Sequence, residues 1–123
     1  MMGSWNFPVS TIAPFVSAIA AGNAVLIKPS EFSPATSRLL KRFFEKYLDK
    51  RYYRCIEGGV QTSIKLTNTA FDMICFTGST FTGKLIAKAA AQHLTPLILE
   101  LGGKCPTIVD RSANLELASR RYV

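Results

Sequence analysis

The sequence predicts an α/β fold with a parallel sheet and helices on both of its faces. Two observations carry this prediction. Short apolar runs alternate along the chain with segments of helical periodicity, and most of these runs have the composition of fully buried strands. Such an alternation implies strands joined by right-handed helical crossovers. The carboxyl ends of the strands then share one edge of the sheet, where ligands of such folds bind.

The first expected elements are a helix and a short strand. Residues 9–21 have the pattern of a mostly buried helix of small and apolar residues, which Gly22 stops. Residues 24–27 form a short apolar run that ends before Pro29, as expected of a buried strand.

The second expected helix begins at Ser33 and Pro34, which are suited to an N-cap and a first helical turn. A strand over residues 52–56 follows and ends at Gly58 and Gly59. Within the helix that starts at Pro34, apolar residues recur at helical spacing: Leu39, Leu40, Phe43, Phe44, Tyr47 and Leu48.

The second half of the chain continues the alternation. Residues 61–68 have a weak helical pattern and residues 72–76 form an apolar strand. Ser79 or Thr80 caps the next helix, whose expected inner face comprises Phe81, Leu85, Ile86, Ala89 and Ala90, with Lys84 and Lys88 outside. The last expected elements are strands over 96–101 and 106–109 and a helix over 114–123.

Length and composition bound the class of protein. The 123 residues suffice for one compact domain with its own core. Hydrophobic residues at 48% and charged residues at 19% are ordinary for a globular protein and exclude wholesale disorder. The net charge is +7, and apolar residues interleave the basic ones at helical spacing, so we interpret these as a solvated helix face and expect no nucleic-acid partner. The clustered basic residues are Arg38, Lys41, Arg42, Lys46, Lys50, Arg51 and Arg54.

Cysteine and histidine usage argues against disulfides and metals. Cys55, Cys75 and Cys105 include no CxxC pair, and an odd number does not close a disulfide framework, so a reducing, cytoplasmic location fits best. The single His93 leaves no His/Cys cluster at zinc spacing, and we expect no bound metal. The apolar tract over residues 11–27 is interrupted by proline, glycine and polar residues, and predicts neither a membrane span nor a signal peptide.

The segment from Gly78 to Lys84 lies between an expected strand and an expected helix, where backbone N–H groups and the helix dipole favour an anion. Its GxxxxGK spacing matches a P-loop, but Leu85 stands where a P-loop needs a hydroxyl for Mg²⁺. The competing interpretation is G-x-T-x-x-G, a looser relative of the dinucleotide fingerprint. The third interpretation is that this segment is only a helix-capping turn.

Other polar positions are also candidates for chemistry. Lys28 and Glu31 follow the first buried strand, where a carboxylate can accept both hydroxyls of a ribose while an ammonium donates to one of them. Glu100 ends a strand-like run, and an acid in partly apolar surroundings can act as a general base. Asn6, next to Trp5, carries an amide that can donate to a developing oxyanion. Each of these has an ordinary alternative. Lys28 and Glu31 could be exposed loop charges. Glu100 could be an edge-strand glutamate paired with Lys104, and Asn6 could lie in a turn.

Four segments in this order resemble the NAD(P)-dependent aldehyde dehydrogenase superfamily, and its fatty-aldehyde and class 3 branch most closely. They are SWNFP at 4–8, AGNAVLIKPSE at 21–31, FTGSTFTGK at 76–84 and HLTPLILELGGK at 93–104. The resemblance implies a Rossmann-like fold, with residues 1–123 as a partial dinucleotide-binding domain. The catalytic and oligomerisation segments of the family are absent from these residues, and family members have cofactor-binding strands ahead of the position of Met1.

The resemblance also assigns roles to individual residues. Asn6 resembles the amide that stabilises the oxyanion, and Glu100 resembles the general base for the hydrolytic water. An acid at Glu31 should repel a 2′-phosphate, which favours NAD as the cofactor, with NADP possible. The residues assigned to cofactor contacts, to the pyrophosphate turn or to its helix packing are Trp5, Lys28, Glu31, Gly78, Ser79 and Gly83.

The family's nucleophile is a cysteine in a G-Q-x-C-like motif, which this chain does not contain. Cys55 and Cys75 are expected to be small buried residues of strands, and Cys105 a somewhat exposed local departure from the family pattern. The leading hypothesis is therefore part of an enzyme that oxidises a medium or long aldehyde to a carboxylate, inactive by itself.

The alternative hypothesis is a truncated, non-catalytic module that binds nucleotides or other proteins. Apolar surface left uncovered by absent segments would drive its association with full-length relatives or with a second copy. Some members of the fatty-aldehyde branch carry a C-terminal membrane tail, a question that these residues leave open.

Overall fold

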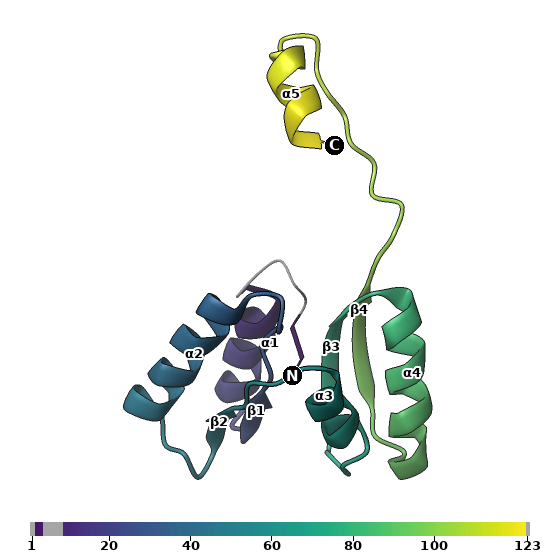
Figure 1. The fold of residues 1–123 in the computed structure, drawn as a ribbon. Coiled ribbons are helices and arrows are strands. Elements are labelled where there is room, and N and C mark those ends of the chain that lie inside the picture. The colour runs from purple at the N-terminus through teal and green to yellow at the C-terminus, as the bar shows by residue number, and fades with distance from the viewer. Residues whose placement is uncertain (1, 4–8, 123) are drawn as a thin grey trace.

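The computed structural model describes residues 2–3 and 9–122. Helices and strands alternate along the chain as the sequence predicts, with bounds that differ by one or two residues at most ends (Figure 1). The elements are α1 (Val9–Ala20), β1 (Val25–Ile27), α2 (Pro34–Tyr47), β2 (Tyr53–Cys55), α3 (Val60–Thr67), β3 (Ile74–Gly78), α4 (Thr80–Ala90), the 3₁₀ turn η1 (Ala91–His93), β4 (Leu97–Leu101) and α5 (Leu115–Tyr122).

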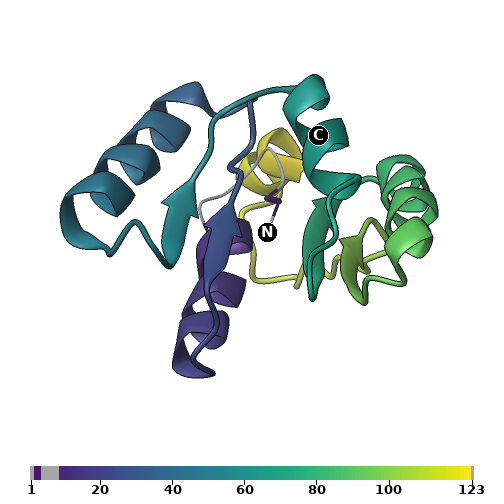
Figure 2. The same cartoon turned by 90° about the horizontal axis from the view of Figure 1, so that it is seen from below.

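The strands form two parallel pairs, β1 with β2 and β3 with β4. Met2 joins the pairs, because it forms parallel bridges with Lys28, which follows β1, and with Phe76 in β3. The order across the molecule is therefore β2, β1, Met2, β3, β4, and the two pairs stand side by side in Figure 2. The predicted parallel α/β fold is confirmed.

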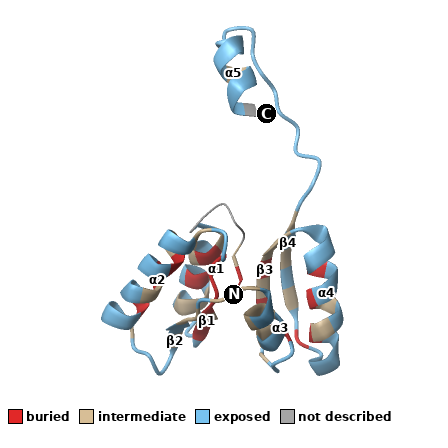
Figure 3. Ribbon diagram, viewed as in Figure 1, coloured by how far each residue is buried: buried red, intermediate tan, exposed pale blue. Residues whose placement is uncertain are grey.

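Helices cover opposite faces of this arrangement. Residues paired across parallel strands point to the same face, so Lys28, Met2 and Phe76 share one face and Ile27 points to the other. On the Ile27 side, Phe15 of α1 and Phe44 of α2 pack with β1 and their ring centroids lie 4.8 Å apart. On the Phe76 side, α4 packs through Ile86 and Ala90. Figure 3 shows the buried positions of the helices and strands in red.

The expected inner faces of α1 and α2 are wider than the observed ones. In α1 only Thr11 and Phe15 are buried, so the expectation of a mostly buried helix is wrong. In α2 the residues that contact the core are spaced by three or four positions and include Leu40 and Phe44, while Leu39, Phe43 and Tyr47 are exposed. A two-stranded sheet offers only a narrow surface, and each helix buries one stripe against it.

The inner face of α4 is also rotated from the expected one. Gly83, Ile86 and Ala90 are buried, whereas Phe81 and Leu85 are exposed, which contradicts their predicted inward position. The cause is Gly83, because a Cβ built there would lie 2.8 Å from Cδ2 of Leu101 in β4. The helix approaches the strand through this glycine, and Phe81 is turned to solvent.

The chain leaves the body after β4. Residues 102–114 run without strand pairing and lead to α5, which stands away from the other elements in Figure 1. The predicted strand over residues 106–109 is wrong, since a strand needs a neighbour to satisfy its backbone and none lies beside this segment in the described structure. No helix among the described residues is long and apolar enough to cross a membrane.

Candidate functional site

The carboxyl edge of the sheet brings three connections together. Residues 28–33 follow β1, residues 56–59 follow β2, and Ser79 follows β3. Because all the strands are parallel, these connections leave the sheet at the same edge, as the fold class predicts.

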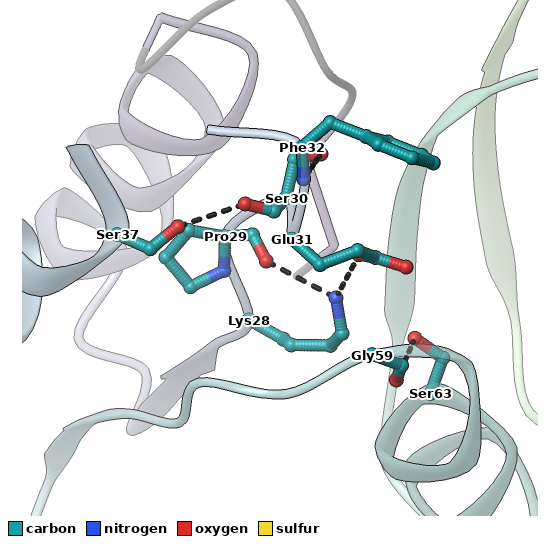
Figure 4. Close-up of polar contacts among 8 residues, drawn as sticks. All are labelled: Lys28, Pro29, Ser30, Glu31, Phe32, Ser37, Gly59 and Ser63. Carbon is teal, nitrogen blue, oxygen red and sulfur yellow. Dashed lines mark hydrogen bonds and ion pairs between the residues drawn. The ribbon is translucent and has the colours of Figure 1, made fainter. Parts of the chain in front are cut away.

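Lys28 is the most constrained charge of this edge. It directly follows the fully buried Ile27, and its own side chain is only 3% exposed. Its Nζ donates to the carbonyl oxygen of Pro29 at 3.1 Å and to Oε2 of Glu31 at 2.9 Å (Figure 4). A buried ammonium needs such partners, and the interpretation of Lys28 as an exposed loop charge is wrong. These two bonds use two of its three N–H groups.

Glu31 is the accessible half of this ion pair, with a side chain that is 34% exposed. Burial by itself would raise the pKa of its carboxyl, but hydrogen bonds from its own backbone and from Lys28 outweigh burial and hold the pKa below the ordinary 4.5. Since the pKa is lowered by folding, the pair stabilises the fold above pH about 4.5 and loses this contribution as the pH falls further. At neutral pH the site presents a carboxylate.

Two buried serines, which the sequence interpretation missed, hold the backbone of this connection. Oγ of Ser37, in α2, donates to the carbonyl oxygen of Ser30 at 2.8 Å, and Oγ of Ser30 accepts from the backbone N–H of Phe32 at 3.2 Å. The connection is thereby tied to the first turn of α2. Only the presence of hydroxyls on both sides of the Ser33–Pro34 helix start could have indicated this contact.

The amino end of α3 lies beside Lys28 in Figure 4, where Gly59 and Ser63 are drawn. Gly59 is the N-cap residue of α3, and Oγ of Ser63 donates to its carbonyl oxygen at 3.4 Å. Gly58 has a φ of +155°, and a Cβ there would lie 2.1 Å from Oγ1 of Thr62. The sequence interpretation treated these glycines only as the end of a strand and missed this helix end as a wall of the site.

The start of α4 is capped as predicted, and Ser79 rather than Thr80 is the cap. Oγ of Ser79 accepts from the backbone N–H of Thr82 at 3.1 Å, and the carbonyl oxygen of Ser79 accepts from Gly83 at 2.9 Å. The N–H groups of the first helical turn point out of the helix end, where they can meet an anion. Close contacts explain both glycines of the motif, because a Cβ at Gly78 would lie 2.4 Å from the Phe76 ring.

This geometry contradicts the P-loop interpretation. Ser79 is the only residue between the end of β3 and the start of α4, and Gly83 lies inside the helix against Leu101. A P-loop wraps phosphate with the backbone of a glycine-rich loop, and the segment contains no such loop.

Glu100 lies elsewhere on the same sheet. It is an exposed residue of β4, opposite Thr77 of β3, and both border a cavity of about 880 Å³. The ion pairs of the described residues do not include one between Glu100 and Lys104, the ordinary alternative for this glutamate. Asn6 and Trp5 lie outside the described residues.

The cysteines do not form a reactive centre. Cys55 and Cys75 lie in β2 and β3 as predicted but are half-buried rather than buried, and Cys105 is exposed. Burial, followed by the charge of Glu57, raises the pKa of the Cys55 thiol to about 11, and burial likewise raises the pKa of Cys75. No group of three His, Cys, Asp or Glu side chains among the described residues is placed to hold a metal ion.

Known proteins share this sequence and this fold. The rat aldehyde dehydrogenase family 3 member A2 is 48% identical over 98% of the chain, and the Arabidopsis thaliana chloroplastic family 3 member I1 is 48% identical over all of it. A mouse protein named aldehyde dehydrogenase, dimeric NADP-preferring, is 50% identical over 98%. The chain spans only 22% to 27% of the length of these relatives.

Solved structures agree with these relatives. A Staphylococcus aureus AldH in a substrate-bound state superposes with a TM-score of 0.83 at 42% identity, over 98% of this chain and 26% of that one. An S. aureus betaine aldehyde dehydrogenase in complex with NAD⁺ gives a TM-score of 0.73 at 35% identity, again over 98% of this chain and 25% of that one. The model of the aldehyde dehydrogenase family matches residues 1–123 from end to end. The chain belongs to the aldehyde dehydrogenase family.

Proposed function

We propose that this chain forms the nucleotide-binding part of an NAD(P)-dependent aldehyde dehydrogenase that oxidises a medium- or long-chain aldehyde to a carboxylate. The observation that carries this proposal is the buried Lys28 fixed to the accessible Glu31 at the carboxyl edge of the sheet. Burial of a charge is costly, and a buried charge beside an accessible partner at a ligand-binding edge marks a candidate functional site. The chemistry that a bound dinucleotide supplies is the acceptance of a hydride.

The described residues fit such a ligand. The remaining N–H of Lys28 can donate to a ribose hydroxyl, and the accessible carboxylate of Glu31 can accept from the ribose hydroxyls. The capped start of α4 supplies backbone N–H groups and a positive dipole end for the diphosphate. Gly83 allows α4 to approach β4 closely, which fixes the position of this helix end.

Nucleotide binding by the chain itself tests the proposal. Titration calorimetry with NAD should detect binding, and Lys28→Met should weaken it by about tenfold or more, because a charge-assisted hydrogen bond is lost. Lys50→Met, which removes an exposed lysine before β2, should leave the affinity unchanged. Circular dichroism of both variants checks that the fold is retained. Failure of the folded chain to bind NAD at millimolar concentration would contradict the proposal.

A preference for NAD over NADP belongs to the same proposal. The ionised Glu31 would face the 2′-phosphate of NADP, and Lys28 is already engaged with that carboxylate. Relatives include a mouse enzyme named as NADP-preferring, so this choice varies within the family. Equal affinity of the chain for both cofactors would count against the preference.

The chain alone should not turn over. The half-buried thiols of Cys55 and Cys75 have raised pKa values, which keeps them protonated at neutral pH, and Cys105 lies in the exposed segment after β4. Incubation with NAD and a long-chain aldehyde should therefore yield no NADH absorbance above the protein-free control. Turnover at an ordinary enzymatic rate would show that one of these cysteines acts as the nucleophile.

The second candidate function is a non-catalytic module that associates with longer family members. The exposed apolar residues Met73 and Ile98 beside the cavity favour it. Co-purification with a full-length relative, together with a native transcript that stops after Val123, would support this alternative over the enzyme.

A further inference from the structure

The outer surface of α2 carries a basic row and an apolar row of side chains, each with one residue every four positions. The basic row comprises Arg38, Arg42 and Lys46, and the apolar row comprises Leu39, Phe43 and Tyr47. Residues four apart lie above one another on a helix, so each row extends for about 12 Å along the axis. Leu39 and Arg42 are three positions apart, as are Phe43 and Lys46, which makes the two rows neighbours.

Both rows are accessible in the described structure. The three basic side chains are exposed, and the apolar ones retain 46% exposure at Leu39, 48% at Phe43 and 66% at Tyr47. Leu40 and Phe44, on the opposite side of the helix, are buried and hold α2 to the body. The helix lies at one end of this body in both Figure 1 and Figure 2, so its outer surface is free to meet a large partner.

The charge of this surface is not neutralised by its neighbours. The ion pairs of the described residues include none of the three members of the basic row. Glu45 is the one acidic residue of α2. Of the nearby acids, Asp49 is paired with Arg51, and Glu57 lies 3.7 Å from Lys41. The basic row therefore presents three cations to whatever meets α2.

The aromatic residues of the apolar row contact one another and a cation. The ring centroids of Phe43 and Tyr47 lie 5.9 Å apart, and Nζ of Lys46 lies 5.0 Å from the centroid of Tyr47. The ammonium thus covers one face of the Tyr47 ring, a face that a stacked nucleic-acid base would need. A tyrosine with an apolar ring and a polar hydroxyl is instead suited to a boundary between water and an apolar phase.

We propose that α2 docks this protein on a membrane surface that contains anionic lipids. The apolar row enters the boundary between headgroups and acyl chains, and the basic row meets the lipid phosphates and carboxylates beside it. A second copy of this surface would bring like charges together, which disfavours a dimer through α2. A soluble polyanion would match the charge but offer no apolar phase to Leu39 and Phe43. None of these residues belongs to the proposed cofactor site.

Co-sedimentation with vesicles tests the contribution of charge. The chain should bind vesicles of phosphatidylserine and phosphatidylcholine in equal parts, and binding to phosphatidylcholine alone should be much weaker. Replacement of Arg38, Arg42 and Lys46 together by glutamine should lower the affinity by on the order of a hundredfold. The matched control replaces Lys65, Lys84 and Lys88, which are exposed on α3 and α4, and should lower it by less than about tenfold.

A second pair of variants tests the apolar row. Leu39→Gln with Phe43→Gln removes apolar surface without a change in charge and should weaken vesicle binding by on the order of tenfold. Phe81→Gln with Leu85→Gln, at exposed positions of α4, is the control and should leave binding nearly unchanged. Circular dichroism checks that every variant retains the fold, as expected for exposed positions.

The losses expected of the α2 variants, with smaller losses in their α4 counterparts, support the membrane surface. Equal losses in both triple variants overturn the proposal, because binding would then reflect only the net charge. Full binding by the Leu39→Gln, Phe43→Gln variant, displaced by heparin, overturns it in favour of a soluble polyanion. Equal binding to both kinds of vesicle, or to neither, also overturns it. Nucleotide affinity is no part of these readouts, so failure here is distinguishable from failure of the cofactor site.

Discussion

The Lys28–Glu31 pair shows how much depends on the burial of a single side chain. The sequence places a lysine and a glutamate after an apolar strand, which is enough to predict their position but not their environment. The ammonium is buried, and the hydrogen bond from Ser37 to the carbonyl oxygen of Ser30 ties the connection that carries it to α2. The result is a fixed cation beneath an accessible carboxylate, a matched donor and acceptor for a diol.

A substitution at Glu31 tests the role of this carboxylate in cofactor choice. Glu31→Gln removes the negative charge while it keeps the shape, so the ratio of NADP affinity to NAD affinity should rise by on the order of tenfold. Glu45→Gln, on the exposed side of α2, is the control and should leave the ratio unchanged. Calorimetric titration of each variant with both cofactors measures the ratio. An unchanged ratio in Glu31→Gln would mean that another group sets the preference.

At the scale of elements, the cap of α4 serves both the fold and the proposed anion site. Ser79→Ala removes the acceptor for the Thr82 N–H and should lower the free energy of unfolding by about 1 kcal/mol. Ser79→Asp keeps an acceptor at the cap and should retain most of that stability, because aspartate is as good an N-cap residue. Urea denaturation of the three proteins measures the difference.

The same pair of variants separates capping from cofactor binding. The aspartate adds a negative charge where a diphosphate is proposed to lie, so NAD affinity should fall in Ser79→Asp although its stability is retained. An aspartate variant that binds NAD as well as the parent chain would place the diphosphate away from α4.

The elements that the sequence predicts correctly are those with local signals. Gly22, Pro29 and the Ser79 cap mark ends that depend only on neighbouring residues. The expected strand over residues 106–109 failed because a strand also depends on a partner, which no local pattern reveals. The prediction that Phe81 points inward is wrong for a similar reason. The rotation of α4 depends on a tertiary contact, between Gly83 and Leu101. The sequence indicated Lys28 and Glu31 as site residues because they follow a predicted strand. Gly59 and Ser37 lie at the site only because of tertiary contacts, which no local pattern indicates.

At the scale of the whole molecule, the described chain is a packed body followed by an exposed arm. The arm comprises residues 102–114 and α5, and its apolar residues, such as Ile108 and Leu115, are exposed. Limited trypsin treatment should therefore cleave after Lys104 and Arg111 before it cleaves in the packed body, which ends with β4. Extended, exposed backbone fits the active-site cleft of a protease, whereas packed helices and strands do not. Mass spectrometry of early products measures the order. Cleavage after Lys46 in α2 at an equal rate would contradict this division.

The position of Met2 has a thermodynamic consequence. Phe15, Val25, Ile27 and Phe44 form one apolar cluster, and Ile74, Phe76, Ile86 and Ala90 form another, to which Met2 contributes its side chain. The N–H and the carbonyl oxygen of Met2 bond to Cys75 and Thr77 of β3, and the N–H of Gly3 donates to the carbonyl oxygen of Lys28, so residues 2 and 3 couple the two clusters. Each cluster is small, and a chain built from two weakly coupled clusters melts as two cooperative units rather than one. Cooperativity of unfolding in this molecule thus depends on how firmly the few backbone hydrogen bonds of Met2 and Gly3 hold.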